Sequence, residues 1–265
     1  MIVDLDSKML VEYLTKKMQI RISHWLVSLI IVGALLVGGC TSQEVSSQAT
    51  QNSSATTPVS TTQANNPQMT NLPRLEGKAT VVMVVKGSPI TIEVDGTNAP
   101  VTAGNFVDLV QRGVYDNSVF HRVEKSPQPF VVQGGDPQSK DPNFRGQLGT
   151  GGFVDPETKQ PRNIPLEIKP KGADSPVYSK TFESARISQP PELDHKRGAV
   201  AMARSMSPDS ASSQFYFALS DINFLDGNYA VFGYVTQGMD VVDKIAVGDK
   251  IESAKVTQGA ENLKK

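Results

Sequence analysis

Residues 79–94 read ATVVMVVKGSPITIEV and set the class of fold. The first half, 79–85, is a run of β-branched and apolar residues, and the Lys-Gly-Ser-Pro that follows is typical of a turn. In the second half, Ile90, Ile92 and Val94 alternate with polar residues, which is the pattern of a half-buried strand. The stretch therefore predicts two strands joined by a short turn.

Two helices and several more short strands are predicted beyond this pair. Residues 100–112 place apolar side chains at helical spacing, with Pro100 at the start and Gly113 after the end. A second helix is predicted over 239–246. Further strands are expected at 118–123, 130–133, 198–203, 213–219, 230–235 and 253–257. Many short strands with only two helices favour a mainly β fold, an antiparallel barrel or sandwich.

Proline and glycine are concentrated in the middle of the chain. Eleven of the 17 prolines lie between Pro127 and Pro191, and 146–152 is rich in glycine. We expect a proline-rich insertion over about 138–194, since long loops are usually functional or mobile. The glycine cluster matches no phosphate-binding motif.

The N-terminal region has the pattern of an export signal. An apolar core, WLVSLIIVGALLV at 25–37, follows Lys16, Lys17 and Arg21 and precedes two glycines and Cys40. The string VGGC at 37–40 resembles the lipobox of bacterial lipoproteins, which implies a signal peptide over 1–39 and a lipidated Cys40. An uncleaved anchor with an incidental cysteine is the alternative, and both interpretations export and tether the protein.

Residues 41–71 have the composition of a disordered linker. Ser, Thr, Gln and Asn make up 22 of these 31 residues, and the single charge is Glu44. Such a segment cannot bury enough apolar surface to offset the entropy lost on ordering. We therefore expect three parts: the signal peptide, a linker over 40–71, and a folded domain over 72–265.

The overall composition excludes several classes of function. The net charge of −1 argues against nucleic acid as a partner, because phosphate binding needs an excess of Lys and Arg. One cysteine and three histidines leave little for a metal site or a disulfide framework. We expect no metal and no cofactor, and we expect His121 and His195 to be structural.

Six strings in the folded part carry a resemblance to a known family. They are FHR at 120–122, FVVQGGD at 130–136, GTGG at 149–152, AMAR at 201–204, SSQFYF at 212–217 and FLDG at 224–227 followed by VFG at 231–233. In order and spacing they resemble the cyclophilin family of peptidyl-prolyl cis-trans isomerases, over about residues 76–258. The resemblance implies a closed eight-stranded antiparallel β-barrel capped by two α-helices, with a proline-binding groove on its outer surface.

The resemblance also implies a set of site residues. Arg122 matches the catalytic arginine, and Gln133 matches a glutamine that contacts the substrate backbone. The remaining matches are substrate-binding residues of the groove: Phe130, Val131, Ala203, Arg204, Gln214, Tyr216, Phe224, Leu225 and Tyr229. By strand alternation, Phe215 and Phe217 face the core and Tyr216 faces the groove.

The chemistry of prolyl isomerisation fits these residue types. Rotation about an X–Pro bond forms no covalent intermediate and meets a barrier of ~18–20 kcal/mol. A guanidinium, always charged, can hydrogen-bond the prolyl nitrogen or the carbonyl as the amide twists. That interaction favours the twisted state over the planar one, which is the requirement for catalysis. An apolar cup holds the proline ring meanwhile.

Several positions depart from the common pattern of the family. Seven residues separate Arg122 from Phe130, more than usual, so we expect the edge of the groove to be displaced. Val131 replaces a methionine, Tyr216 a phenylalanine, Phe224 a tryptophan and Tyr229 a histidine. Two tyrosine hydroxyls predict a more polar cup, and loss of the indole N–H argues against tight cyclosporin binding.

The sequence leaves two classes of function open. In the first, an exported monomeric isomerase accelerates the folding of proline-containing exported polypeptides. In the second, a binding module uses the same groove to hold proline-containing peptides with little turnover. An envelope scaffold whose insertion docks a partner is compatible with either.

Overall fold

The computed structural model describes residues 71–265. The predicted signal peptide, Cys40 and all but the last residue of the predicted linker lie outside the described residues. Among residues 71–265, no helix is both long and apolar enough to cross a bilayer. The strands are β1 (Arg74–Leu75), β2 (Lys78–Val85), β3 (Ser88–Asp95), β4 (Arg122–Val123), β5 (Val131–Gly134), β6 (Glu167–Ile168), β7 (Val177–Tyr178), β8 (Ala199–Met202), β9 (Phe215–Ala218), β10 (Val231–Gln237), β11 (Ile251–Gln258) and β12 (Leu263–Lys264). The α-helices are α2 (Pro100–Gln111), α3 (Phe182–Ala185) and α4 (Met239–Lys244).

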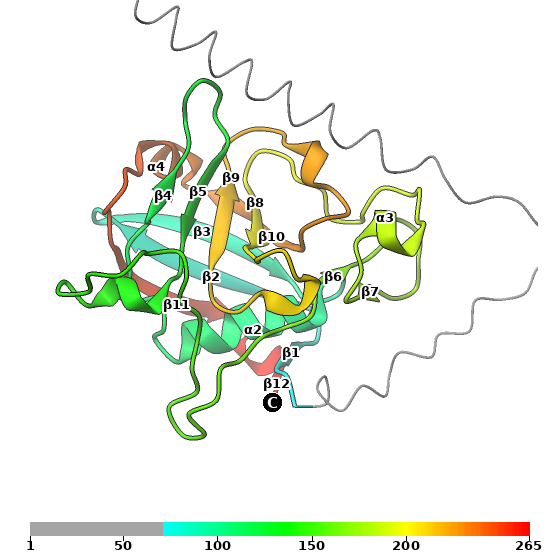
Figure 1. Ribbon diagram of the computed structural model, residues 1–265, viewed down its shortest axis with the longest axis horizontal. Helices are drawn as coiled ribbons and strands as arrows, with labels where there is room; N and C mark the ends of the chain where they lie inside the picture. The colour runs from blue at the N-terminus through cyan, green and yellow to red at the C-terminus, as the bar shows by residue number, and fades with distance from the viewer. Residues whose placement is uncertain (1–70) are drawn as a thin grey trace, which may run out of the picture. The chain divides into compact units, whose positions relative to one another are not determined.

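Eight strands form one antiparallel sheet that curls into a barrel (Figure 1). Their order is β11-β2-β3-β10-β8-β9-β5-β4. The edge strands β11 and β4 are joined through the segment before β4, where Val119 and Lys250 form an antiparallel bridge. Backbone hydrogen bonds from Asn117 to Ile251 and from Phe120 to Asp249 extend this seam. The expected mainly β fold with an eight-stranded antiparallel sheet is confirmed.

The predicted elements agree with the observed ones, with differences at their ends. Each predicted barrel strand overlaps an observed strand, and the predicted helices match α2 and α4. The strand expected at 118–123 is reduced to β4 because 117–120 bonds across the seam instead of in the main ladder. The strand expected to reach Ala203 ends at Met202. The short strands β1, β12, β6 and β7 and the helix α3 are not predicted.

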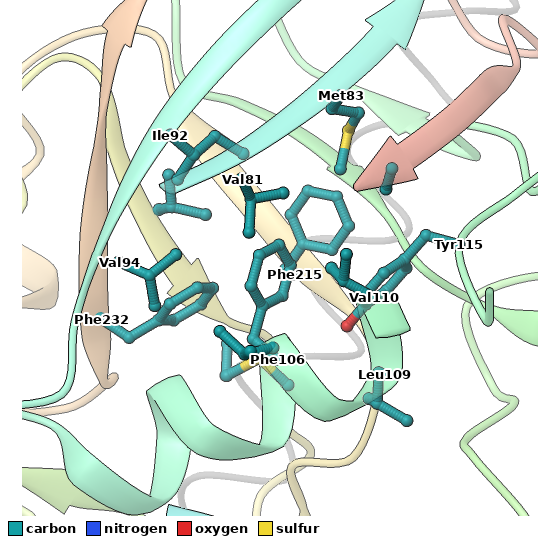
Figure 2. Packing of buried hydrophobic residues seen from close by; sticks show 14 of the residues in the cluster. Val81, Met83, Ile92, Val94, Phe106, Leu109, Val110, Tyr115, Phe215 and Phe232 are labelled. Atoms are coloured by element: carbon teal, nitrogen blue, oxygen red, sulfur yellow. The ribbon is translucent and has the colours of Figure 1, made fainter. Parts of the chain in front are cut away.

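The barrel interior and the inner face of α2 form one apolar core (Figure 2). Phe106 of α2 packs against Phe232 and Phe215, with ring centroids 4.8 Å and 5.5 Å away. Phe215 and Phe217 are fully buried in this core, as strand alternation predicts. Alternate residues of β9 therefore point outward, which places Tyr216 on the outer surface of the barrel.

The proline-rich segment 138–194 is packed against the barrel. Phe153 and Ile164 join the barrel core, and Leu166, Ile168 and Phe182 form a further apolar cluster with Ala230. The short hairpin of β6 and β7 lies within this segment (Figure 1).

Candidate functional site

Four neighbouring strands carry a row of side chains across the outer face of the barrel. In the sheet register, Arg122 of β4 lies opposite Gln133 of β5, Gln133 lies opposite Tyr216 of β9, and Tyr216 lies opposite Ala201 of β8. Residues directly opposite in antiparallel strands point to the same face. The curled sheet thus brings together residues that are up to 94 positions apart in the sequence (Tyr216 minus Arg122).

A chain of hydrogen bonds runs along one side of this row. Arg122 Nη1 donates to Gln133 Oε1 at 3.3 Å, and Gln133 Nε2 donates to Gln214 Oε1 at 3.0 Å. Gln214 Nε2 donates in turn to the carbonyl oxygen of Gly151 at 2.7 Å. Each glutamine side chain accepts a hydrogen bond through its oxygen and donates one through its nitrogen. These hydrogen bonds determine which end of each side-chain amide is the oxygen. The guanidinium is therefore held through Nη1 by a neutral acceptor, while its Nε lies 3.6 Å from a carboxylate oxygen of Glu124.

On the other side of the row lies a small apolar cluster that is separate from the barrel core. Its buried members include Val131, Tyr216 and Ile222, and the half-buried side chains around them form its open edge. Six of the residues expected in the groove belong to it: Phe130, Val131, Ala203, Tyr216, Leu225 and Tyr229. We call this set, with Ala199, Ala201, Ala218, Ile222 and Val231, the outer cluster.

Aromatic and guanidinium groups form the rim of the outer cluster. Phe224 is 71% exposed and stacks on Phe130, with the two rings 5.8 Å apart. Arg204 lies over the Tyr229 ring at 4.7 Å and donates from Nε and Nη2 to the carbonyl oxygen of Asn228. These contacts connect Phe224 and Arg204 to the same site. The structure thus brings all eleven residues predicted for the groove into one region.

The long connection between Arg122 and Phe130 is closed at its base by backbone hydrogen bonds. The backbone N–H of Glu124 bonds to Val131, and that of Phe130 bonds back to Glu124, so the extra residues loop outward from a closed hairpin. The Arg122 guanidinium carbon remains 5.7 Å from the centre of the Phe130 ring. The displacement expected at the edge of the groove stays a prediction.

A polar hollow of about 510 Å³ lies beside the outer cluster. Four predicted site residues line it, namely Gln133, Ala203, Arg204 and Gln214, and the rest of its wall was not predicted. The additional lining residues are Gly149, Thr150, Gly151, Gly152, Phe153, Val154, Pro161, Asn163, Ser205, Ser210 and Ser212.

Asp136 shapes the wall of the polar hollow. Its carboxylate is fully buried and accepts from the backbone N–H groups of Gly149 at 2.7 Å and Gly151 at 3.1 Å. Gly135, just before it, has φ +85°, and a Cβ there would lie 2.5 Å from the Ser213 carbonyl oxygen. The strings GTGG at 149–152 and SSQ at 212–214 contain several of the lining residues, so they are the part of the sequence from which this wall could have been predicted.

Burial controls the protonation of the groups in the site. Burial raises the pKa of the Tyr216 phenol, so its hydroxyl stays protonated at neutral pH. Burial lowers the pKa of His121, the neighbour of Arg122, against the opposing effect of Asp136. Within residues 71–265, no group of three or more His, Cys, Asp or Glu side chains is placed to hold a metal ion. Arg122 and the outer cluster together offer hydrogen bonding by a permanent cation beside an apolar surface.

A closed β-barrel with an arginine-glutamine row on its outer face is the architecture that the sequence resemblance implies. Comparisons of the chain with known proteins point to the same class. Residues 80–262 match the family model described as cyclophilin type peptidyl-prolyl cis-trans isomerase/CLD. A putative thylakoid lumen peptidyl-prolyl cis-trans isomerase of Synechocystis is 45% identical over 207 residues, which covers 74% of this chain and 51% of the relative. A chloroplastic peptidyl-prolyl cis-trans isomerase of Arabidopsis thaliana is 42% identical over 211 residues, covering 73% and 45%.

The chain belongs to the cyclophilin type peptidyl-prolyl cis-trans isomerase family. It spans about half the length of these curated relatives. Among solved structures, a cyclophilin type isomerase of Cryptosporidium parvum matches with a TM-score of 0.51 at 22% identity, over 68% of this chain and 98% of the other. That likeness supports the fold.

Proposed function

We propose that this protein is a peptidyl-prolyl cis-trans isomerase that acts on proline-containing polypeptides. The observation that carries the proposal is the row across β4, β5 and β9, which sets the Arg122 guanidinium beside the outer cluster. Family membership supports the same reaction. No covalent step is needed, so a cation aimed at a twisting amide beside an apolar surface is a sufficient catalyst.

In this mechanism the outer cluster holds the proline ring while the preceding carbonyl turns. Arg122 donates to the prolyl nitrogen as it loses its resonance with the carbonyl, and Gln133 bonds the peptide backbone. Gln214, Ala203 and Arg204 support the backbone on the side of the polar hollow. The apolar contact surface consists of Phe130, Val131, Tyr216, Phe224, Leu225 and Tyr229.

The test is replacement of the guanidinium. We expect Arg122→Ala to lower kcat/KM by about 100-fold, the usual cost of removing one donor from a developing charge, and Arg122→Lys to retain part of the rate because it keeps the charge and loses the planar fork. Exchange between cis and trans peptide, followed by NMR without a coupled protease, measures the rate. Because Arg122 is about half exposed, the fold is expected to survive. A rate unchanged in Arg122→Ala refutes the assigned role.

The alternative is a module that binds proline-containing peptides with little turnover, used alone or as part of an envelope scaffold. The same NMR experiment separates the two functions. A wild-type protein that binds the peptide without accelerating its exchange is a binding module, and the isomerase proposal then fails.

We further propose that the protein is exported as a monomer and anchored to a membrane through lipid on Cys40. Two features of the sequence support this proposal. Residues 16–40 run from basic to apolar to small side chains, and residues 41–71 have the composition of a disordered linker. The name of the Synechocystis relative places that protein in the thylakoid lumen, which is also an extracytoplasmic compartment.

Cys40→Ser tests the anchor. The variant is expected in the soluble extracytoplasmic fraction or as an uncleaved precursor, whereas the wild type is expected in the membrane fraction with a lipid-modified N-terminal peptide by mass spectrometry. An unmodified Cys40 in membrane-bound wild type favours the uncleaved anchor.

A further inference from the structure

Behind the outer cluster, the Tyr216 hydroxyl belongs to a polar relay whose other two side chains, His195 and Asp226, the mechanism above does not use. His195 Nδ1 lies 2.7 Å from a carboxylate oxygen of Asp226, and His195 Nε2 lies 2.9 Å from the hydroxyl oxygen of Tyr216. The His195 side chain is 1% exposed. The imidazole therefore connects the loop that carries Leu225 to a ring in the wall of the outer cluster.

The chemistry of the three groups fixes where the protons lie. An ionised carboxylate only accepts, so Nδ1 must carry the hydrogen that points to Asp226. Burial lowers the pKa of His195 despite the opposing effects of Asp226 and Asp194, so the ring stays neutral and Nε2 presents a lone pair. The Tyr216 hydroxyl must then donate to Nε2. Its one proton is directed away from the open edge of the outer cluster.

The hydrogen bond from Tyr216 to His195 explains how a tyrosine can lie in an apolar wall. Two tyrosines in the site predict a polar cup, yet the hydroxyl of Tyr216 is satisfied from behind, and its ring lies in the outer cluster with Val131 and Leu225. A separate backbone bond, from the N–H of Ile222 to the carbonyl oxygen of His195, ties the His195 main chain to the start of the loop that carries Phe224. The side-chain relay itself holds the Tyr216 wall of the outer cluster.

We propose that His195 is a positioning residue that keeps the Tyr216 hydroxyl turned away from the peptide, so that the tyrosine ring presents an apolar face to the proline. The proposal rests on the proposed function, since it names a determinant of that same groove. His195 touches neither the peptide nor Arg122; it acts through Tyr216. Asp226 has a supporting part, because it selects the tautomer that can accept from the phenol.

Removing the acceptor should change peptide binding. In His195→Leu the Tyr216 hydroxyl, which is buried, has no partner behind it and must seek one on the peptide side. We expect the dissociation constant and KM for the tetrapeptide Ala-Ala-Pro-Phe to rise about tenfold, with kcat changed less than about threefold, as for a loss of uniform binding. Tyr216→Phe alone is expected to weaken binding less than His195→Leu does, because it removes the hydroxyl together with its need for a partner.

The double variant His195→Leu/Tyr216→Phe separates positioning from packing. With the hydroxyl gone, no unsatisfied group remains, so the double variant should bind as Tyr216→Phe does and more tightly than His195→Leu. Tyr115→Phe is the matched control, since Tyr115 also donates a buried hydroxyl, to the Ser213 carbonyl oxygen, and lies in the barrel core. It should lose stability and keep KM.

An NMR readout of the imidazole tests the relay even if the protein is not an isomerase. Long-range ¹⁵N–¹H spectra of the full-length protein should show neutral His195 with its proton on Nδ1, and Asp226→Asn should disturb that preference. A proton on Nε2, an unchanged dissociation constant in His195→Leu, a double variant that does not recover, or a Tyr216→Phe that binds as weakly as His195→Leu would each overturn the proposal. Absence of catalysis in wild type refutes only the proposed function, because peptide binding and the tautomer are measured separately.

Discussion

The Arg122 guanidinium is shared between a neutral and a charged neighbour. Gln133 accepts from Nη1 at 3.3 Å, and Glu124 Oε1 lies 3.6 Å from Nε. The glutamine leaves the full positive charge available to a twisting amide, whereas the carboxylate partly offsets it. Both members of the ion pair are about half exposed, at 47% and 49%, so the pair is weak and screened by salt.

Glu124→Gln should therefore raise kcat/KM at low ionic strength. Removing a competing carboxylate frees Nε of Arg122 for the substrate, and a surface pair worth ~0.2–1 kcal/mol corresponds to about a threefold change. At about 1 M salt, where the Debye length is ~3 Å, the two proteins should become equal. The measurement is kcat/KM by NMR exchange over a salt series. A decrease at low salt, instead of an increase, would mean that Glu124 holds the guanidinium in its working orientation.

Individual site residues differ in how far the sequence reveals them. Alternation in SSQFYF separates Tyr216 from its buried neighbours Phe215 and Phe217, because a strand has period two. The partner of the Tyr216 hydroxyl could not be predicted, since His195 lies 21 residues away on another segment and only the fold brings the two together. The same holds for Asp136, whose carboxylate organises a glycine loop 13 to 15 residues further on.

The helix α2 depends on a residue supplied by the proline-rich segment. Ala99, the residue before the helix, makes no side-chain cap. Instead Glu167 of β6 accepts from the backbone N–H groups of Val101 at 3.1 Å and Thr102 at 2.7 Å, two donors that have no partner within the helix. Burial raises the pKa of Glu167, and these same N–H groups oppose the shift. One carboxyl therefore joins the first turn of α2 to a hairpin 65 residues away.

Loss of this distant cap should be measurable. Glu167→Ala leaves two buried N–H groups without an acceptor, which should lower the free energy of unfolding by about 2–3 kcal/mol. Chemical denaturation measures the loss, and hydrogen exchange should show faster opening of the first turn of α2. Glu183→Ala is the control, because Glu183 lies exposed in the same segment, and it should change stability by less than about 0.5 kcal/mol. Equal effects of the two substitutions would show that Glu167 does not cap the helix.

Long elements were predictable, and the two-residue strands outside the barrel sheet were not. The strands β2 and β3 and the helix α2 each extend over at least eight residues, enough for a period to emerge from the sequence. The pairs β1–β12 and β6–β7 contribute two residues per strand, too few for any pattern. The position of β1 follows from packing: Gly104 of α2 lies so close to the backbone of β1 that a Cβ would be 2.5 Å from the Arg74 Cα.

Segment 138–194 is built into the folded domain. It supplies Phe153 and Ile164 to the barrel core and Glu167 to α2, and Asn163 and Pro161 to the wall of the polar hollow. Deleting the segment would therefore expose core surface and the start of a helix as well as remove any docking surface. Substitutions at its exposed positions are the better test of a scaffold role, since they leave these contacts in place.

The burial of His195 makes the stability of the whole protein depend on pH, because folding disfavours protonation of the imidazole ring. Burial lowers the pKa of His195 below its ordinary value of 6.5, against the opposing effects of Asp226 and Asp194. As the pH falls below about 6.5, His195 takes up a proton in the unfolded chain and not in the folded protein. The stability that the neutral, buried His195 contributes at higher pH is therefore lost as the pH falls toward its folded-state pKa.

We expect the free energy of unfolding of wild type minus that of His195→Gln to decrease between pH 7.5 and 5.5, by at most ~1.4 kcal/mol per pH unit. Denaturation of both proteins at each pH measures this difference. Glu167, whose pKa is raised by burial, and His121, whose pKa is lowered, contribute equally to both proteins and cancel. A difference that is constant with pH would mean that the imidazole titrates alike in the folded and unfolded chain. The His195 ring would then not be the desolvated, neutral acceptor that the Tyr216 hydroxyl requires. A measurement of the stability of the whole domain therefore also tests the hydrogen bond between His195 and Tyr216 in the wall of the site.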